Sequence, residues 1–139
     1  REAKAVVHGL ERELAGRLRF VYRNFPLIEI HPHALQAAEA AETADAQGKF
    51  WEMHELLFAH QKAIETADLL RYAAELHLDT ERFVADLTAH THIQRIQRDL
   101  DSGDSSGVMG TPALFIGERM HDGRRDHASL LAALQSAGA

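Results

Sequence analysis

Ten histidines in 139 residues make metal binding the first chemistry to consider. His54 and Glu55 match the opening of a metalloprotease helix, in which a second histidine must follow four residues after the first. The next histidine is His60, six residues after His54, so the two imidazoles would lie on different faces of a helix. Segment 31–33 adds further histidines, but its spacing does not join them to His54. We therefore predict no metal site and assign these histidines to helix caps or solvated faces.

Nucleophilic chemistry also lacks its usual residues. The sequence contains no cysteine, so neither a thiol nucleophile nor a disulfide is available within it. Ser102, Ser105 and Ser106 lie outside any Gly-x-Ser-x-Gly frame, which indicates turn residues rather than an activated hydroxyl. The glycines around them neither follow a predicted strand nor open a helix, as a phosphate-binding loop requires. We predict no bound cofactor.

The composition is that of one globular domain and argues against two kinds of partner. A hydrophobic fraction of 45% and a charged fraction of 26% are ordinary for a folded domain of this length. The 15 basic residues are interleaved with 21 acidic ones and the net charge is −6, so we expect no nucleic-acid-binding surface. No apolar run approaches the roughly 20 residues that a membrane span needs.

The sequence begins with Arg1 rather than methionine, which indicates a processed chain or a piece of a longer one. Any targeting signal would then lie upstream. The compartment is therefore open, and the bacterial periplasm and the cytoplasm are both compatible with the sequence.

Segment 108–117 carries the strongest local signal. Its glycines and Pro112 predict a turn, and the apolar residues 113–116 predict a short buried strand after it. Because proline lacks an N–H and is tolerated at the first residue of a strand, Pro112 is expected to begin that strand. Residues 117–118 then predict a tight reversal, and 119–121 an edge strand that completes a hairpin.

Hydrophobic periodicity places the other elements. It predicts a first helix over 1–15 and, from strict alternation, a strand over 17–25 that Pro26 ends. In a later helix, Arg95 and Asp99 are spaced for an exposed ion pair. A block of helices is expected next. The first covers 33–46 with Pro32 at its first position, others begin at residues 50, 66 and 79, and the last covers 93–100 and is ended by segment 101–107. One more helix is expected after Asp126.

Polar residues mark where three of these helices begin. Thr66, Asp79 and Asp126 are the expected N-caps, because their side chains can accept a hydrogen bond from the first turn. Leu78 precedes one of these caps and is expected to pack on Phe83 as a hydrophobic staple.

The single tryptophan, Trp51, lies in the densest aromatic stretch of the sequence, residues 50–58. Such a stretch is typical of a mostly buried helix, and core packing is favoured over ligand contact. The alternative is that Trp51 lines a hydrophobic groove.

Four segments together resemble the DsbA-like family of thioredoxin-fold thiol:disulfide oxidoreductases, namely 20–27 (FVYRNFPL), 31–34 (HPHA), 48–54 (GKFWEMH) and 108–112 (VMGTP). The resemblance implies an α/β, thioredoxin-like fold over the single domain 1–139, with a helical insertion of approximately 32–106. It also implies a cis Thr111–Pro112 peptide bond. Thr111 and Pro112 are the only site positions of the family that are present. With them we predict Met109, Gly110 and Trp51 as substrate-binding residues.

Two parts of the family's pattern are absent. Its first strand and Cys-x-x-Cys motif would end immediately before Arg1, and disulfide exchange needs that dithiol. We therefore expect the chain as given to be redox-inactive by itself, with an upstream dithiol and a protein or peptide thiol or disulfide as substrate in the full-length form. In the family the missing strand lies between the strands that match 17–25 and 113–116. Another segment or another chain would fill this gap, or the two flanking strands would rearrange and close it, and we favour a homodimer formed by strand exchange.

Two alternatives to the oxidoreductase stay open. A non-catalytic thioredoxin-fold module would bind peptides without exchanging disulfides. A relative resembling glutathione transferases would use a serine in place of the nucleophilic cysteine, but Ser105 and Ser106 are not where that residue would lie.

Overall fold

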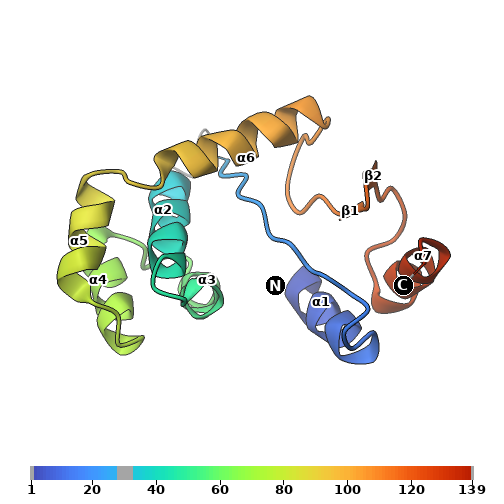
Figure 1. The fold of residues 1–139 in the computed structure, drawn as a ribbon, viewed down its shortest axis with the longest axis horizontal. Helices are drawn as coiled ribbons and strands as arrows, with labels where there is room; N and C mark the ends of the chain where they lie inside the picture. Colours follow the sequence, from blue (N-terminus) through green and yellow to red (C-terminus); the bar gives the residue numbers. More distant parts are fainter. Residues whose placement is uncertain (1, 28–32, 139) are drawn as a thin grey trace. The chain divides into compact units, whose positions relative to one another are not determined.

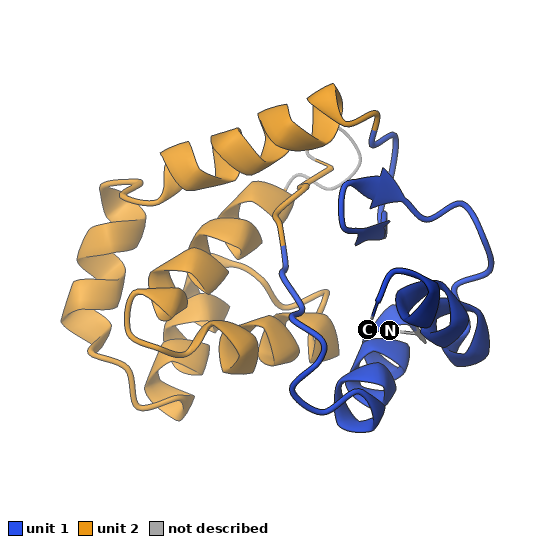
Figure 2. Cartoon of the chain, turned by 45° about the vertical axis from the view of Figure 1, so that its right-hand side comes forward, with its two compact units in different colours: residues 1–22, 108–139 blue, residues 23–107 orange. Residues whose placement is uncertain are grey.

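The computed structural model describes residues 2–27 and 33–138, which contain seven helices and two strands (Figure 1). The chain divides into two compact units, one of residues 1–22 with 108–139 and one of residues 23–107 (Figure 2). Each unit has its own helices and its own buried residues. None of the described helices combines the length and the apolar composition that crossing a bilayer requires.

The helices of unit 23–107 surround an apolar core. They are α2 (Ala34–Asp45), α3 (Phe50–Ala59), α4 (Thr66–Glu75), α5 (Thr80–Thr88) and α6 (Ile93–Ser105). Three alanines of α2 are buried in this core, where their small side chains let α2 lie close to its neighbours. The larger core side chains come from α3, α4 and α5 and include Met53, Leu69, Tyr72 and Phe83. Pro32, the expected first position of α2, lies outside the described residues.

Helix α6 is longer than expected. It continues through Ser105 instead of ending near residue 100, although serine, glycine and aspartate are poor helix formers. Tertiary contacts hold its second half, since the Asn24 N–H donates to Asp99 Oδ2 at 2.9 Å and Arg23 Nη1 donates to Ser102 Oγ at 3.3 Å. Packing thus overrides local propensity in this segment.

The other unit joins two helices to a hairpin. Its elements are α1 (Glu2–Glu13), β1 (Phe115–Ile116), β2 (Arg119–Met120) and α7 (His127–Ser136). The strands are antiparallel, with Phe115 opposite Met120 and Ile116 opposite Arg119, so the predicted hairpin is confirmed. The expectation of a buried strand begun by Pro112 is wrong, because β1 begins at Phe115, which is exposed. Gly117 has a φ of +61° in the connecting turn, a conformation that glycine adopts without strain.

Helices α1 and α7 pack against each other. Leu10, Leu14 and Leu130 are buried in this unit. Gly9 permits the close approach, because a Cβ atom at that position would lie 3.0 Å from the ring of His127. His127 Nε2 also lies 3.2 Å from Glu13 Oε2, so the same imidazole links the two helices.

The predicted strand over 17–25 is wrong. Residues 18–27 have no regular secondary structure, and no ladder includes them, although their side chains alternate between exposed and half-buried from Arg17 to Arg23. Alternation shows that a segment suits a sheet surface, but a strand also needs a neighbouring strand with which to pair. Within the described part of the chain, only β1 and β2 form such a pair.

Two of the three expected N-caps are confirmed. Asp79 Oδ1 accepts the Arg82 N–H at 3.0 Å, and Leu78 and Phe83 are both buried in the core cluster, as a staple requires. At α4 the expectation is wrong, because Glu65 is the N-cap and Thr66 is already helical. There the longer side chains of Glu65 and Asp68 form a reciprocal capping box, which satisfies two backbone N–H groups at once.

Asp126 caps α7, and its pKa is lowered from the usual 3.8 because the Ser129 N–H and hydroxyl donate to the carboxylate. A carboxyl whose folded pKa lies below its unfolded value contributes stability above the unfolded value and loses it as the pH falls through the folded one. We expect Asp126→Ala to lower the helicity of α7 at pH 7, with the difference from wild type shrinking as the pH falls below 3.8 and through the lowered pKa of Asp126. Amide exchange of residues 127–136 measures this, and Asp122→Ala is the control. Equal protection of both variants at pH 7 would contradict it.

Candidate functional site

The predicted turn lies directly before β1. The Thr111–Pro112 bond is cis, as predicted from the resemblance. Met109 is 95% exposed, Thr111 and Pro112 are exposed, and Gly110 is half-buried, so the turn presents both backbone and side chains to solvent. These four predicted site residues are therefore consecutive and accessible.

Strand β1 continues from this turn with one edge paired and the other open. The His121 N–H donates to the Leu114 carbonyl at 2.8 Å, and Ile116 pairs with Arg119. Since successive residues of an antiparallel strand direct their backbone groups to opposite edges, those of Ala113 and Phe115 face away from β2. Outside the β1–β2 ladder, neither Ala113 nor Phe115 makes a backbone–backbone hydrogen bond with another described residue. In the DsbA-like pattern, the family's first strand would pair at this edge.

Trp51, the fifth predicted site residue, belongs to α3 in the other unit. The expectation of a mostly buried helix is correct for one face only, because Met53, His54 and Leu57 are buried whereas Trp51 is 44% exposed. Its indole lies edge-on to Phe50, with ring centroids 5.0 Å apart, and to His54, at 5.4 Å. Core packing therefore explains only part of the position of Trp51.

The histidines take structural positions. His54 stacks on Phe58 with ring centroids 4.5 Å apart, and His60 stacks on Tyr72 at 5.5 Å while its Nδ1 lies 3.0 Å from the Leu56 carbonyl oxygen. Within 2–27 and 33–138, no three histidine, aspartate or glutamate side chains are grouped so that they could hold a metal ion. His31 lies outside the described residues.

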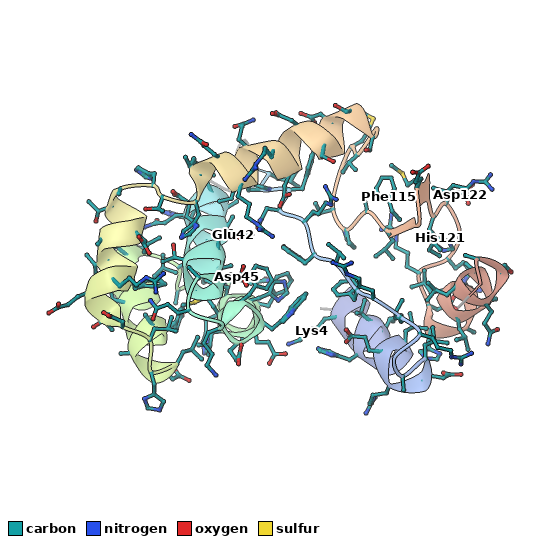
Figure 3. All side chains as sticks on the ribbon, in the orientation of Figure 1. Lys4, Glu42, Asp45, Phe115, His121 and Asp122 are labelled. Atoms are coloured by element: carbon teal, nitrogen blue, oxygen red, sulfur yellow. The ribbon has the colours of Figure 1, made fainter. Side chains whose placement is uncertain are left out.

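A polar cluster that the sequence analysis missed joins α2 to α6. Glu42 is 4% exposed, and its carboxylate lies 2.9 Å from Arg95 Nε and accepts from Asn24 Nδ2 at 2.6 Å (Figure 3 labels Glu42 on α2). The predicted exposed pair of Arg95 with Asp99 is therefore wrong, because Asp99 instead accepts from Asn24. Leaving a buried carboxylate without a partner costs far more free energy than a surface ion pair contributes, so Arg95 pairs with Glu42 rather than with Asp99.

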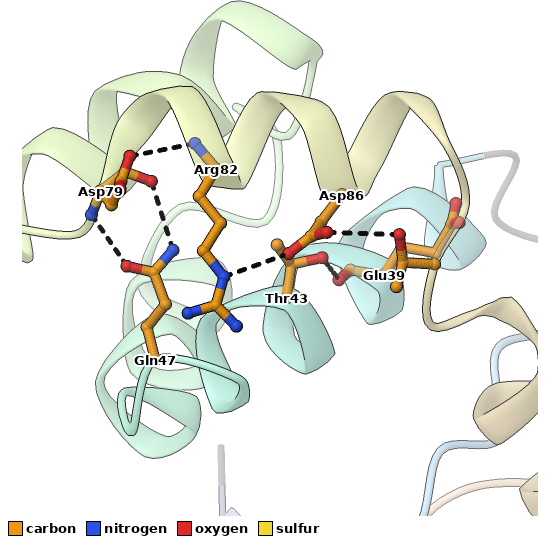
Figure 4. Close-up of polar contacts among 7 residues, drawn as sticks. Glu39, Thr43, Gln47, Asp79, Arg82 and Asp86 are labelled. Carbon is orange, nitrogen blue, oxygen red and sulfur yellow. Dashed lines mark hydrogen bonds and ion pairs between the residues drawn. The ribbon is translucent and has the colours of Figure 1, made fainter.

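A second buried carboxylate lies one turn earlier on α2. The side chain of Glu39 is 6% exposed, and His90 Nδ1 lies 2.7 Å from its Oε1. Nearby, the α2–α5 contact is completed by Gln47 and Asp79, whose amide and backbone groups bond reciprocally at 2.8 and 3.2 Å (Figure 4). The sign of these two buried carboxylates in the sequence was the position of Glu39 and Glu42, three residues apart in an alanine-rich segment. Both clusters position helices and lie away from the turn in sequence.

Comparison with known proteins gives one family and one group of relatives. The model of the family described as Thioredoxin matches residues 1–136. A Na(+)/H(+) antiporter NhaA 3 of Salinispora tropica is 49% identical over 120 residues, which is 86% of this chain and 18% of that protein. A Na(+)/H(+) antiporter NhaA of Herminiimonas arsenicoxydans is 42% identical over 127 residues, 91% of this chain and 20% of that protein.

The similarity therefore covers most of this chain and only about a fifth of these relatives, whose shares are 18% and 20%. No solved structure matches the chain. The helices and the small hairpin are compatible with a thioredoxin-like α/β fold. Because the family model extends over nearly the whole sequence, the chain belongs to the thioredoxin family.

Proposed function

We propose that the chain is the substrate-holding part of a DsbA-like thiol:disulfide exchange domain, with its helical insertion at approximately residues 32–106. Membership in the thioredoxin family supports this proposal. The observation that carries it is the accessible turn of Met109, Gly110, Thr111 and Pro112 just before β1, with its cis Thr111–Pro112 bond. An extended peptide lying along this turn would pair with its backbone.

The sulfur chemistry must come from outside residues 1–139, which contain no cysteine. In the exchange, a thiolate attacks one sulfur of a disulfide, a mixed disulfide forms, and the other sulfur leaves as a thiolate. The second thiol of the pair then attacks the mixed disulfide and releases the product thiolate, so two electrons pass between the pair and the substrate. The part proposed for this chain is to hold the peptide in an extended form while its sulfur is attacked.

The coding sequence directly upstream of the Arg1 codon tests the source of the sulfurs. A Cys-x-x-Cys motif that ends next to Arg1 would support the proposal. Its absence would end the oxidoreductase proposal and leave a module without exchange chemistry.

If the motif is present, the longer product should reduce insulin disulfides, and Thr111→Lys should slow this reaction by about tenfold or more. The reason is that a lysine in the turn obstructs the peptide there, and tenfold corresponds to about 1.4 kcal/mol of lost binding. The matched control is Thr88→Lys at the exposed end of α5, which should keep the wild-type rate. Equal rates for the two variants would show that the turn does not hold substrate.

A non-catalytic role beside a transporter is the second candidate, because the similar segment in the relatives is part of proteins named Na(+)/H(+) antiporters. In this proposal the chain is a thioredoxin-fold peptide-binding module that accompanies a Na(+)/H(+) antiporter. Sodium-dependent proton movement would be measured in vesicles that carry the antiporter, with the module intact and with Thr111→Lys. An unchanged rate, together with a flat peptide titration of the isolated chain, would dispose of this candidate.

A further inference from the structure

The three methionines of the chain differ in how far solvent reaches them. Met109 is 95% exposed, Met120 is 42% exposed, and Met53 is fully buried in the core of unit 23–107. Because the sequence has no cysteine, their thioethers are its only sulfur atoms. A hydroperoxide oxidises a thioether only where it can reach the sulfur. The three exposures therefore predict that Met109 is oxidised first.

The surroundings of Met109 leave this sulfur accessible. A Cβ atom added to the next residue, Gly110, would meet no atom of the described chain within 4 Å apart from its neighbours in sequence. Thr111 and Pro112, which follow, are also exposed. The family's first strand would pair beside 113–116, and Met109 lies four residues before that segment. The open edge of β1 is therefore not the reason for the exposure of Met109.

We propose that Met109 is the residue through which oxidation regulates the peptide-binding turn, because its sulfoxide form binds peptide less tightly. In the reaction the O–O bond of a hydroperoxide breaks, one oxygen bonds to Met109 Sδ, and the other leaves as water or an alcohol. Two electrons thus pass from the sulfur to the peroxide. Two thiols reverse the change, releasing water and a disulfide. The inference rests on the proposed function, since it concerns the same turn.

The physical cause is the change in polarity of the side chain. A methionine is flexible and apolar, so it packs well against apolar side chains of varied shape. Its sulfoxide carries an oxygen that accepts hydrogen bonds from water. An apolar peptide side chain that covers this oxygen removes the water and supplies no donor, which is costly. The peptides affected are therefore those that place an apolar residue beside Met109.

The order of oxidation is the first test, and it does not depend on the proposed function. Trypsin places each methionine in its own fragment, namely 50–62, 99–119 and 120–124. After brief hydrogen peroxide treatment of the whole folded chain, mass spectrometry should show Met109 oxidised about twice as fast as Met120 or faster, and about tenfold or more faster than Met53. A Met109 that is oxidised no faster than Met120 would overturn the inference and leave the proposed function standing.

Peptide binding is the second test. The probe is the S-carboxymethylated insulin B chain, which has no free thiol, titrated into the chain after the peroxide has been removed. Oxidation should raise its dissociation constant about tenfold, and a methionine sulfoxide reductase with dithiothreitol should restore it. Met109→Gln, which is polar and similar in length, should bind as weakly without peroxide. The matched control, Met120→Leu, should show the same effect of peroxide as wild type.

The outcomes separate this inference from the proposed function. If full oxidation of Met109 leaves the dissociation constant unchanged, the regulation is wrong and the turn can still bind peptide. If peroxide weakens binding by Met109→Leu as much as by wild type, another residue is responsible and the inference is again wrong. If the unoxidised wild type does not bind the probe, the proposed function is contradicted, and the inference fails with it.

Discussion

Replacing Arg95 by methionine should destabilise unit 23–107 by about 2–3 kcal/mol. The cause is the partner it leaves behind, since the carboxylate of Glu42 is only 4% exposed and would lose the guanidinium that lies 2.9 Å away. Breaking a fully buried pair costs about 3–5 kcal/mol, and we place this one lower because the Arg95 side chain is 55% exposed and partly screened by water. Urea unfolding followed by Trp51 fluorescence measures the loss in the same unit.

The double variant Arg95→Met with Glu42→Gln separates the charge from the packing. A neutral amide in place of the carboxylate can still accept from Asn24 Nδ2, so we expect the double variant to recover more than half of the loss. Arg98→Met, on the exposed face of α6, is the matched control and should change the stability by less than about 0.5 kcal/mol. Equal losses in Arg95→Met and Arg98→Met would show that Glu42 does not need its partner.

Features with local causes could be predicted from the sequence. The turn before β1 follows from the backbone restriction of Pro112 and the freedom of the neighbouring glycines, and the Gly117 reversal follows in the same way. Asp79 and Asp126 cap helices whose first-turn N–H groups lie three residues away, so proximity in the sequence already places donor beside acceptor. Only the short cap Thr66 was displaced, by the Glu65 and Asp68 box.

Features with distant causes could not be predicted. Asn24 meets Asp99 across 75 positions of sequence and meets Glu42 across 18, and no periodicity encodes such a meeting. The same contacts extend α6 through residues that disfavour a helix. They also leave Arg95 paired with Glu42 rather than with its predicted partner, Asp99. A strand presents the same difficulty, because residues 17–25 alternate correctly and still have no ladder among the described residues.

The same distinction between local and distant causes applies to the candidate site. Its turn is a local feature and could be located from Gly110, Thr111 and Pro112 alone. What an open edge binds depends on another strand, and one sequence does not contain that information. The edge could be recognised as open only from the hydrogen bond that turns the Leu114 carbonyl towards His121 and leaves the Phe115 groups on the other side.

Two histidines in left-handed backbone conformations offer a matched pair of substitutions. His77 has a φ of +57° after α4, and His90 has a φ of +51° after α5, where glycine is normally preferred. His77→Gly should therefore stabilise the chain by about 0.5–1 kcal/mol, since glycine adopts this conformation without strain. The measurement is the shift of the urea midpoint at constant slope.

His90→Gly should instead destabilise the chain by about 1 kcal/mol, although it relieves the same backbone strain. The difference is Glu39, whose side chain is 6% exposed and loses the imidazole Nδ1 at 2.7 Å. We keep this value small because the His90 side chain is 65% exposed. Adding Glu39→Gln to His90→Gly should bring the stability back towards that of wild type, since an amide is cheaper than a carboxylate to leave in that position. If the two glycine variants were equally stabilised, the contact with Glu39 would contribute nothing, and His90 would be retained at the end of α5 for a reason other than stability.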